Sequence, residues 1–216
     1  MRNAVIVATA GTEPTALLAL LGQHPEIVAP PALGLSTLLH GTSRDIVRTL
    51  RAGRSGAQPT RADYRNSIEL ARRACGSTID LVFSRLRESA PASTVVVWDP
   101  DGLAYPFIEP PDLHVVLPTR EPASAAQRLA GGVHLAEITA SIEEQIACAV
   151  ARPRAWGLPE EHVLRIEEDS LAKQDTRGGT GGLQQLLRFL NVASDAAAIR
   201  YLLRHRRAAP FSRHQH

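Results

Sequence analysis

Short apolar runs alternate along the chain with longer segments whose apolar residues recur every three or four positions. Runs of about five apolar residues have the length of buried strands, and the longer spacing is typical of amphipathic helices. The strand-like runs lie at residues 4–8, 27–31, 94–98, 113–117 and 162–166, with 27–31 a short strand or an extended loop. Strands that alternate with helices predict a parallel sheet covered on both faces.

The segments between these runs predict helices over 16–21, 43–50, 61–75, 77–88, 123–129 and 134–151. Gly76 is expected to end one of these helices before the next begins. In the last third, an apolar stripe at i, i+3, i+4 and i+7 predicts a helix packed on the core; it consists of Leu183, Leu186, Leu187 and Leu190. The predicted fold is therefore a single α/β domain over 1–203. It has a central, mainly parallel sheet of four to five strands, helices on both faces, a helical C-terminal third and a basic tail at 204–216.

The composition excludes several classes of protein. A formal net charge of +2 over 216 residues is too small to indicate a nucleic-acid partner. Cys75 and Cys148 are isolated, without metal-ligand spacing or a disulfide framework. No apolar run approaches the roughly 20 residues of a membrane span, and the first residues lack the pattern of a secretory signal. We expect a cytoplasmic protein without a metal site, a membrane or a nucleic-acid partner, in an oligomeric state left open.

The polar loop at residues 9–15 joins the first strand to an apolar helix. A strand that turns tightly into a helix directs backbone N–H groups and the positive helix end at one place, which suits a phosphate. An ordinary turn without a ligand is the alternative. Gly11 is followed by neither a second glycine nor a lysine in this loop. The loops of P-loop kinases and of dinucleotide-binding enzymes are therefore absent.

Three stretches lie in an order that is informative together. Residues 11–27 hold Gly-Thr, a helix and a His-Pro turn; residues 115–122 form a strand that ends in Arg-Glu-Pro; residues 163–171 form a strand with an acidic end, followed by a helix with Phe-Leu-Asn near residue 190. Together they resemble the sulfotransferase family that uses 3′-phosphoadenosine 5′-phosphosulfate (PAPS). The resemblance covers the chain from near its start to about residue 192.

The resemblance implies a set of cofactor-binding residues. Gly11, Thr12 and Thr15 take the place of the loop that wraps the 5′-phosphosulfate. Arg120 takes the place of the arginine on the 3′-phosphate, where a guanidinium fork binds an anion bidentately; a salt bridge at the sheet edge is the alternative. Arg128 stands where the family often has a serine on the same phosphate, and it either binds that phosphate or faces solvent.

The loop also departs from the family. Thr9-Ala10 replace the usual basic residue and serine, and Glu13 adds a negative charge beside the expected anion. A substitute cation is needed for transfer, and Arg128 and the arginines of 204–207 are the first candidates.

The proton acceptor is expected among Asp99, His40 and Glu13, with Asp101 and His134 as further candidates. Asp99 also begins an Asp-Pro-Asp-Gly turn sequence. The predicted activity is transfer of a sulfuryl group from PAPS to a hydroxyl of a small molecule, with bacterial specialised metabolism as the expected setting. The alternative is a degenerate protein of this fold without sulfuryl transfer, which acts as a binding or partner protein or catalyses other chemistry.

Overall fold

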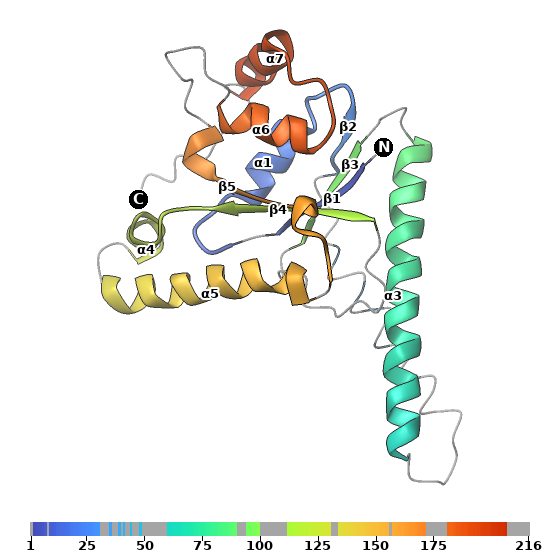
Figure 1. The fold of residues 1–216 in the computed structure, drawn as a ribbon. Coiled ribbons are helices and arrows are strands. Elements are labelled where there is room, and N and C mark those ends of the chain that lie inside the picture. The colour runs from blue at the N-terminus through green and yellow to red at the C-terminus, as the bar shows by residue number, and fades with distance from the viewer. Residues whose placement is uncertain are drawn as a thin grey trace.

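In the computed structural model of the chain, one parallel sheet lies between two layers of helices (Figure 1). The structure describes residues 2–7, 9–30, 60–89, 94–99, 112–130, 134–155, 157–171 and 181–206, together with 35, 39, 41, 44 and 48. The helix expected over 43–50 lies almost entirely outside these residues. Among the described helices, none is long and apolar enough to cross a membrane.

The sheet has five strands in the order β2-β3-β1-β4-β5, and every pair is parallel. They are β1 (Arg2–Val7), β2 (Ile27–Val28), β3 (Thr94–Asp99), β4 (Leu113–Thr119) and β5 (Val163–Glu167). The predicted fold class, a mainly parallel sheet of four to five strands, is confirmed. Because all strands run the same way, their carboxyl ends meet at one edge, where parallel α/β folds bind ligands.

The two faces of β1 bury alternate residues, as the period of a strand requires. Ala4 and Ile6 face α1, α6 and α7, whereas Val5 and Val7 face α3 and α5. The helices are α1 (Pro14–Leu21), α3 (Arg61–Ser89), α4 (Pro122–Ala130), α5 (Leu135–Ala155), α6 (Gly182–Phe189) and α7 (Ala196–Arg206). The short 3₁₀ turns η1 (Glu160–His162) and η2 (Glu168–Leu171) flank β5. The leucine stripe of 183–190 lies along α6 and the residue after it, and it is buried in the core as predicted.

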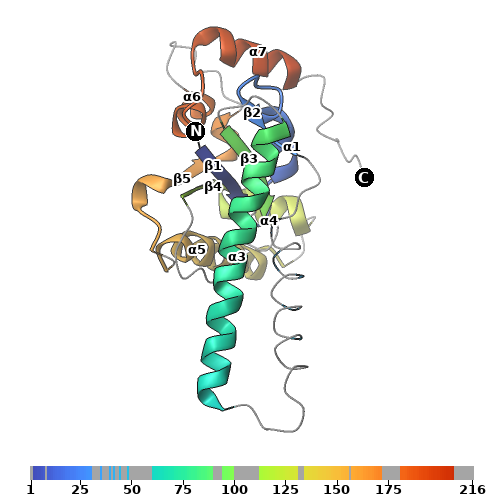
Figure 2. The same cartoon turned by 90° about the vertical axis from the view of Figure 1, so that its right-hand side faces the viewer.

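The prediction that Gly76 ends a helix is wrong, because α3 runs unbroken through it. Cys75, Ile79 and Phe83 lie on one face of α3 and are buried in the core on both sides of Gly76. This packing outweighs the roughly 1 kcal/mol by which glycine disfavours a helix interior. The first half of α3 extends well beyond the sheet, as Figure 2 shows.

Several boundaries differ from the predicted ones. Asp99 is the last residue of β3, one residue beyond the predicted end, and His162 belongs to η1, rather than to β5. The rest of the predicted turn at 99–102 lies outside the described residues. β4 continues through Pro118 to Thr119. β1 pairs with β4 only as far as Val116, so Pro118 lies beyond that ladder and its missing N–H costs no bond to β1. α7 reaches Arg206, and the division of the chain at residue 203 stays a prediction.

Gly76→Ala should raise the free energy of unfolding by about 0.5–1 kcal/mol, because a helical glycine loses more backbone entropy on folding than alanine. A Cβ at Gly76 would meet nothing within 4 Å. Denaturant unfolding followed by circular dichroism measures the change.

Gly157→Ala is the matched control, because its Cβ also meets nothing but its φ is +75°. It should lower the free energy of unfolding by about 1–2 kcal/mol. Equal shifts in both variants would show that backbone conformation does not decide the effect.

Candidate functional site

The loop between β1 and α1 is a tight turn tied to β4. The Thr12 hydroxyl donates to the carbonyl of Thr9 at 2.7 Å, and the Thr12 N–H donates to the same oxygen at 3.2 Å. The Thr9 hydroxyl donates to the carbonyl of Pro118. Among the described residues, the N–H groups of Gly11 and Thr15 have no protein acceptor. The turn therefore offers backbone donors near the positive end of α1, in the arrangement that binds anions.

Gly11 is required here by its conformation and by its packing. Its φ is +77°, and a Cβ on it would stand 2.5 Å from the Cβ of Ala125. Ala125 is fully buried in α4, which follows β4. The first loop and α4 are therefore in direct contact, and any side chain at residue 11 would have to displace one of them.

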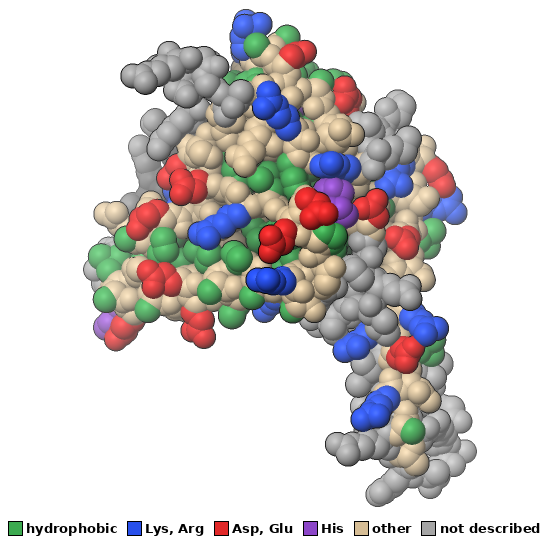
Figure 3. Space-filling view, viewed as in Figure 1, with side chains coloured by type: hydrophobic (Ala, Val, Ile, Leu, Met, Phe, Trp, Pro, Cys, Tyr) green, Lys and Arg blue, Asp and Glu red, His purple; other side chains and the backbone are tan. Residues whose placement is uncertain are grey.

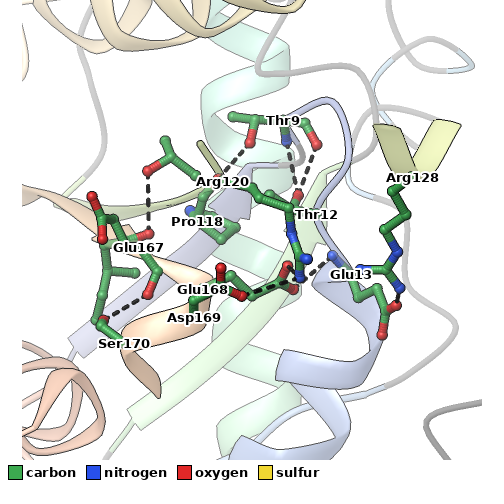
Figure 4. Close-up of polar contacts among 12 residues, drawn as sticks. Thr9, Thr12, Glu13, Pro118, Arg120, Arg128, Glu167, Glu168, Asp169 and Ser170 are labelled. Carbon is green, nitrogen blue, oxygen red and sulfur yellow. Dashed lines mark hydrogen bonds and ion pairs between the residues drawn. The ribbon is translucent and has the colours of Figure 1, made fainter. Parts of the chain in front are cut away.

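Glu168 joins the loop to the end of β4. One of its carboxylate oxygens accepts the N–H of Glu13 at 2.7 Å, and the other accepts from Nη2 of Arg120 at 2.8 Å. Figure 4 shows this carboxylate between the two groups. Only 13% of the Glu168 side chain is exposed. Glu168 thus occupies one of the loop donors and fixes the position of Arg120 at the same time.

Arg120 follows β4 directly and is held by carboxylates. Its Nη2 also lies 3.6 Å from Asp169, and its side chain is 17% exposed. Its Nε is buried and has no hydrogen-bond partner among the described residues. A guanidinium has five N–H donors, so donors remain beyond those that the acidic end of β5 uses. The salt bridge that the sequence offered as the alternative for Arg120 is present, with Glu168. It leaves other N–H donors of the guanidinium, such as Nε, without a partner in the described part of the chain.

Arg128 reaches the loop from α4 and forms an ion pair with Glu13 (Figure 4). The pair is partly exposed, with 41% of the Arg128 side chain and 29% of the Glu13 side chain accessible. The negative charge that Glu13 brings to the loop is therefore balanced by the cation of Arg128. The arginines at 204–207 belong to the end of α7 or lie outside the described residues. Within the described part of the chain, no ion pair joins Arg204 to this loop.

The candidate proton acceptors are spread over different surroundings. Asp99 is fully buried at the carboxyl end of β3, paired in register with Val7 of β1. Glu13 is committed to Arg128, and His134 pairs on the surface with Glu137 at 3.5 Å. His40 and Asp101 lie outside the described residues. Asp99 and Glu13 are thus the candidates that the structure places at the ligand edge, and their roles stay predictions.

The site gathers residues that are distant in the sequence. Gly11, Thr12, Arg120 and Arg128, each expected to bind the cofactor, all belong to this one group of contacts, and Thr15 is exposed in the first turn of α1. The residue without a predicted role is Glu168. Its position at the end of a predicted strand was the available signal, because carboxyl ends of parallel strands meet.

Comparison with known proteins bears on this arrangement. The sequence matches no protein-family model and no curated protein. A similar solved structure is the sulfotransferase domain of the olefin synthase of Synechococcus PCC 7002, with a TM-score of 0.53 and 16% identity over 94% of this chain and 80% of that one. Another is sulfotransferase STF9 from Mycobacterium avium, with a TM-score of 0.51 and 14% identity over 98% of this chain and 69% of that one. The chain has a sulfotransferase fold.

This result confirms the resemblance at the level of the fold. Identities of 14–16% leave the activity to be argued from the side chains that the sulfotransferase fold positions here. The groups in question are the loop at residues 9–13 and the side chains of Arg120 and Arg128, at the carboxyl edge of the sheet.

Gly11→Ala should lower the free energy of unfolding by about 2–4 kcal/mol, because the new Cβ is strained at positive φ and overlaps with Ala125. Adding Ala125→Gly removes the overlap and should recover about 1–3 kcal/mol beyond the sum of the single effects. Denaturant unfolding of both single variants and the double variant measures this coupling. Strictly additive effects would show that the loop and α4 are not in contact.

Proposed function

We propose that the protein is a sulfotransferase that moves a sulfuryl group from PAPS to a hydroxyl of a small molecule. The observation that carries the proposal is the convergence of the anion-type loop, Arg120 and Arg128 at the carboxyl edge of a sulfotransferase fold. In this reaction the acceptor oxygen forms a bond to sulfur, the bond between sulfur and the bridging oxygen breaks, and 3′-phosphoadenosine 5′-phosphate leaves. The acceptor proton passes to a base of the protein.

The loop would bind the 5′-phosphosulfate through backbone donors. Gly11 lets the chain approach an anion closely, and the N–H groups of Gly11 and Thr15 supply donors. The hydroxyl of Thr12 holds the turn in shape by donating to the carbonyl of Thr9. The turn is preorganised, because Thr9 and Thr12 bond within it and to β4. Fixed donors need no rearrangement as charge develops, which is the main source of electrostatic catalysis.

Arg120 would bind the 3′-phosphate with the part of its fork that faces away from Glu168. The unpartnered Nε supports this role, because buried donors without an acceptor are uncommon in folded proteins. Arg128 would supply the positive charge that the loop lacks at Thr9-Ala10. Its pairing with Glu13 holds its guanidinium beside the loop.

Asp99, Glu13 and His40 remain the proposed proton acceptors. Asp99 is placed at the carboxyl end of the strand next to β1, where a bound acceptor would meet the loop. Glu13 could act only if Arg128 left it or shared it. The acceptor is proposed to be a small molecule, and the cytoplasm stays the expected location.

A specific observation favours the alternative, in which the protein has this fold but transfers no sulfuryl group and acts by binding another ligand or a partner. Both site arginines are paired with carboxylates of the chain, Arg120 with Glu168 and Arg128 with Glu13. A site that neutralises its own cations has less charge for a nucleotide. Calorimetry with 3′-phosphoadenosine 5′-phosphate separates the two functions, because absence of binding at millimolar ligand would support the second.

Arg120→Ala should weaken binding of 3′-phosphoadenosine 5′-phosphate by about 1.5–3 kcal/mol, or about 10- to 150-fold, the range for hydrogen bonds to charged groups. Isothermal titration calorimetry on the folded protein measures it. Arg165→Ala, which removes an exposed arginine from β5, is the matched control and should leave affinity unchanged. A lower melting temperature with unchanged affinity would make Arg120 a purely structural residue.

Arg128→Ala should slow PAPS turnover by about 100- to 1000-fold, the range for one preorganised donor. Arg73→Ala removes an arginine from a similar exposed pair with Glu69 at 2.6 Å on α3 and should leave turnover unchanged. The double variant Glu13→Gln, Arg128→Ala tests the reason for the loss. Wild-type turnover in the double variant would mean that Arg128 only neutralises Glu13, and wild-type turnover in Arg128→Ala would refute the electrostatic argument.

A further inference from the structure

Two histidines and an aspartate converge at the opposite, amino-terminal edge of the sheet. Asp112 and His114 flank the first residue of β4, and His162 ends η1 just before β5. The register pairs Val115 with Val163, which brings His114 beside His162, the residue just before β5. One ligand atom from each residue lies within 4.8 Å of the others.

The two rings are fixed by packing. The imidazoles of His114 and His162 stack with centroids 4.3 Å apart and planes at 21°, and the edge of Phe189 lies 5.5 Å from His114. His114 is 5% exposed. The Nδ1 atom of each ring is buried without a hydrogen-bond partner in the described part of the chain. Buried polar atoms normally have partners, so these two nitrogens indicate a ligand that the protein does not itself supply.

The three residues offer donors of two kinds. Each imidazole has a ring nitrogen, and the carboxylate of Asp112 has oxygen atoms. These donor atoms lie close enough together to face one small ion.

We propose that Asp112, His114 and His162 bind a divalent transition-metal ion, for which Zn²⁺ is the best match. Two imidazoles and one carboxylate form a donor set typical of zinc sites, whereas Mg²⁺ and Ca²⁺ prefer oxygen donors. The ion would join the start of β4 to the start of β5. It would stabilise the edge of the sheet that lies away from the loop and Arg120.

One neighbouring charge opposes the ion. Arg2 donates to the carbonyl of Phe189 and lies over its ring at 5.9 Å, which holds its positive charge near the cluster. Asp112 is exposed and supplies the compensating negative charge. Figure 3 shows histidine, acidic and basic side chains together over this part of the molecule.

The test uses the full chain, made without a polyhistidine tag and stripped with a chelator. Zn²⁺ is titrated by calorimetry, and Co²⁺ by the visible absorption of its tetrahedral complexes. One equivalent should bind and raise the melting temperature, while Mg²⁺ should do neither. His162→Asn should weaken Zn²⁺ affinity at least about 100-fold, since even residues that only orient ligands cost about 10- to 100-fold. Asp112→Asn, at an exposed position, should weaken it at least about tenfold.

His134→Asn is the matched control, because His134 is an exposed histidine beside a carboxylate, Glu137. It should bind Zn²⁺ like the wild type. His24 is no competitor, since both of its ring nitrogens contact backbone groups, of Ala193 and Glu26. Histidines also occur at 205, 214 and 216, so a triple asparagine variant tests them. The proposal is overturned if wild-type protein binds no Zn²⁺, if His162→Asn binds it equally, or if only the triple variant loses binding.

Discussion

The whole arrangement depends on the double burial of β1. Residues Ala4 to Val7 are at most 1% exposed, and the strand pairs with β3 on one edge and with β4 on the other. A strand with no exposed face and no free edge can only be the middle of a sheet. Parallel pairing then brings the Thr9 loop, Asp99, Arg120 and Glu168 to one edge. The positions of these residues follow from the strands to which they belong or that precede them.

At that edge, Glu168 holds the first loop and Arg120 in a defined position relative to each other. One oxygen of its carboxylate accepts the N–H of Glu13, and the other accepts from the guanidinium of Arg120. Both partners are at least partly shielded from solvent, so these bonds are stronger than they would be on an open surface. These bonds link the loop, the end of β4 and the end of β5 to one another. A substitution that shifts any one of the three should also shift the other two.

The sheet was predictable because its signal is local. Runs such as Val95-Val96-Val97 are short, continuous and made of β-branched residues, which together favour a strand buried on both faces. The unbroken α3 was not predictable, because Gly76 is judged from local propensity whereas Ile79 and Phe83 are held by tertiary packing. The helix ends differ from the predicted ones by up to four residues, as at the end of α5, and the start of β5 differs by one, for the same reason.

The site was predictable in its residue types more than in its contacts. Arg120 and Gly11 were identifiable because each follows a strand, where ligand-binding residues of this fold class lie. The bond between Glu13 and Glu168 spans 155 positions, and no spacing in the sequence encodes it. The three residues around His114 show the same limit, since Asp112 and His162 meet only through the register of β4 with β5.

The charges at the loop decide how an anion could enter. Glu13, Glu168 and Asp169 bring three negative charges against the two positive charges of Arg120 and Arg128. Pulling Arg120 away from Glu168 would leave a carboxylate that is only 13% exposed without its cation. Breaking such a pair typically costs about 3–5 kcal/mol, more than one phosphate contact returns.

An anion would therefore bind best beside Glu168, as an additional partner of Arg120, rather than by replacing Glu168. It would take the donors of Arg120 that Glu168 leaves unused, while Glu168 stays bound and keeps the guanidinium aimed at the loop. Arg128 differs, because its pair with Glu13 is far more exposed and exposed pairs contribute at most about 1 kcal/mol. Arg128 can leave Glu13 at little cost and turn toward a charge on the loop. Under the proposed function, Arg120 would be a fixed support, and Arg128 would be the cation that moves to where charge develops.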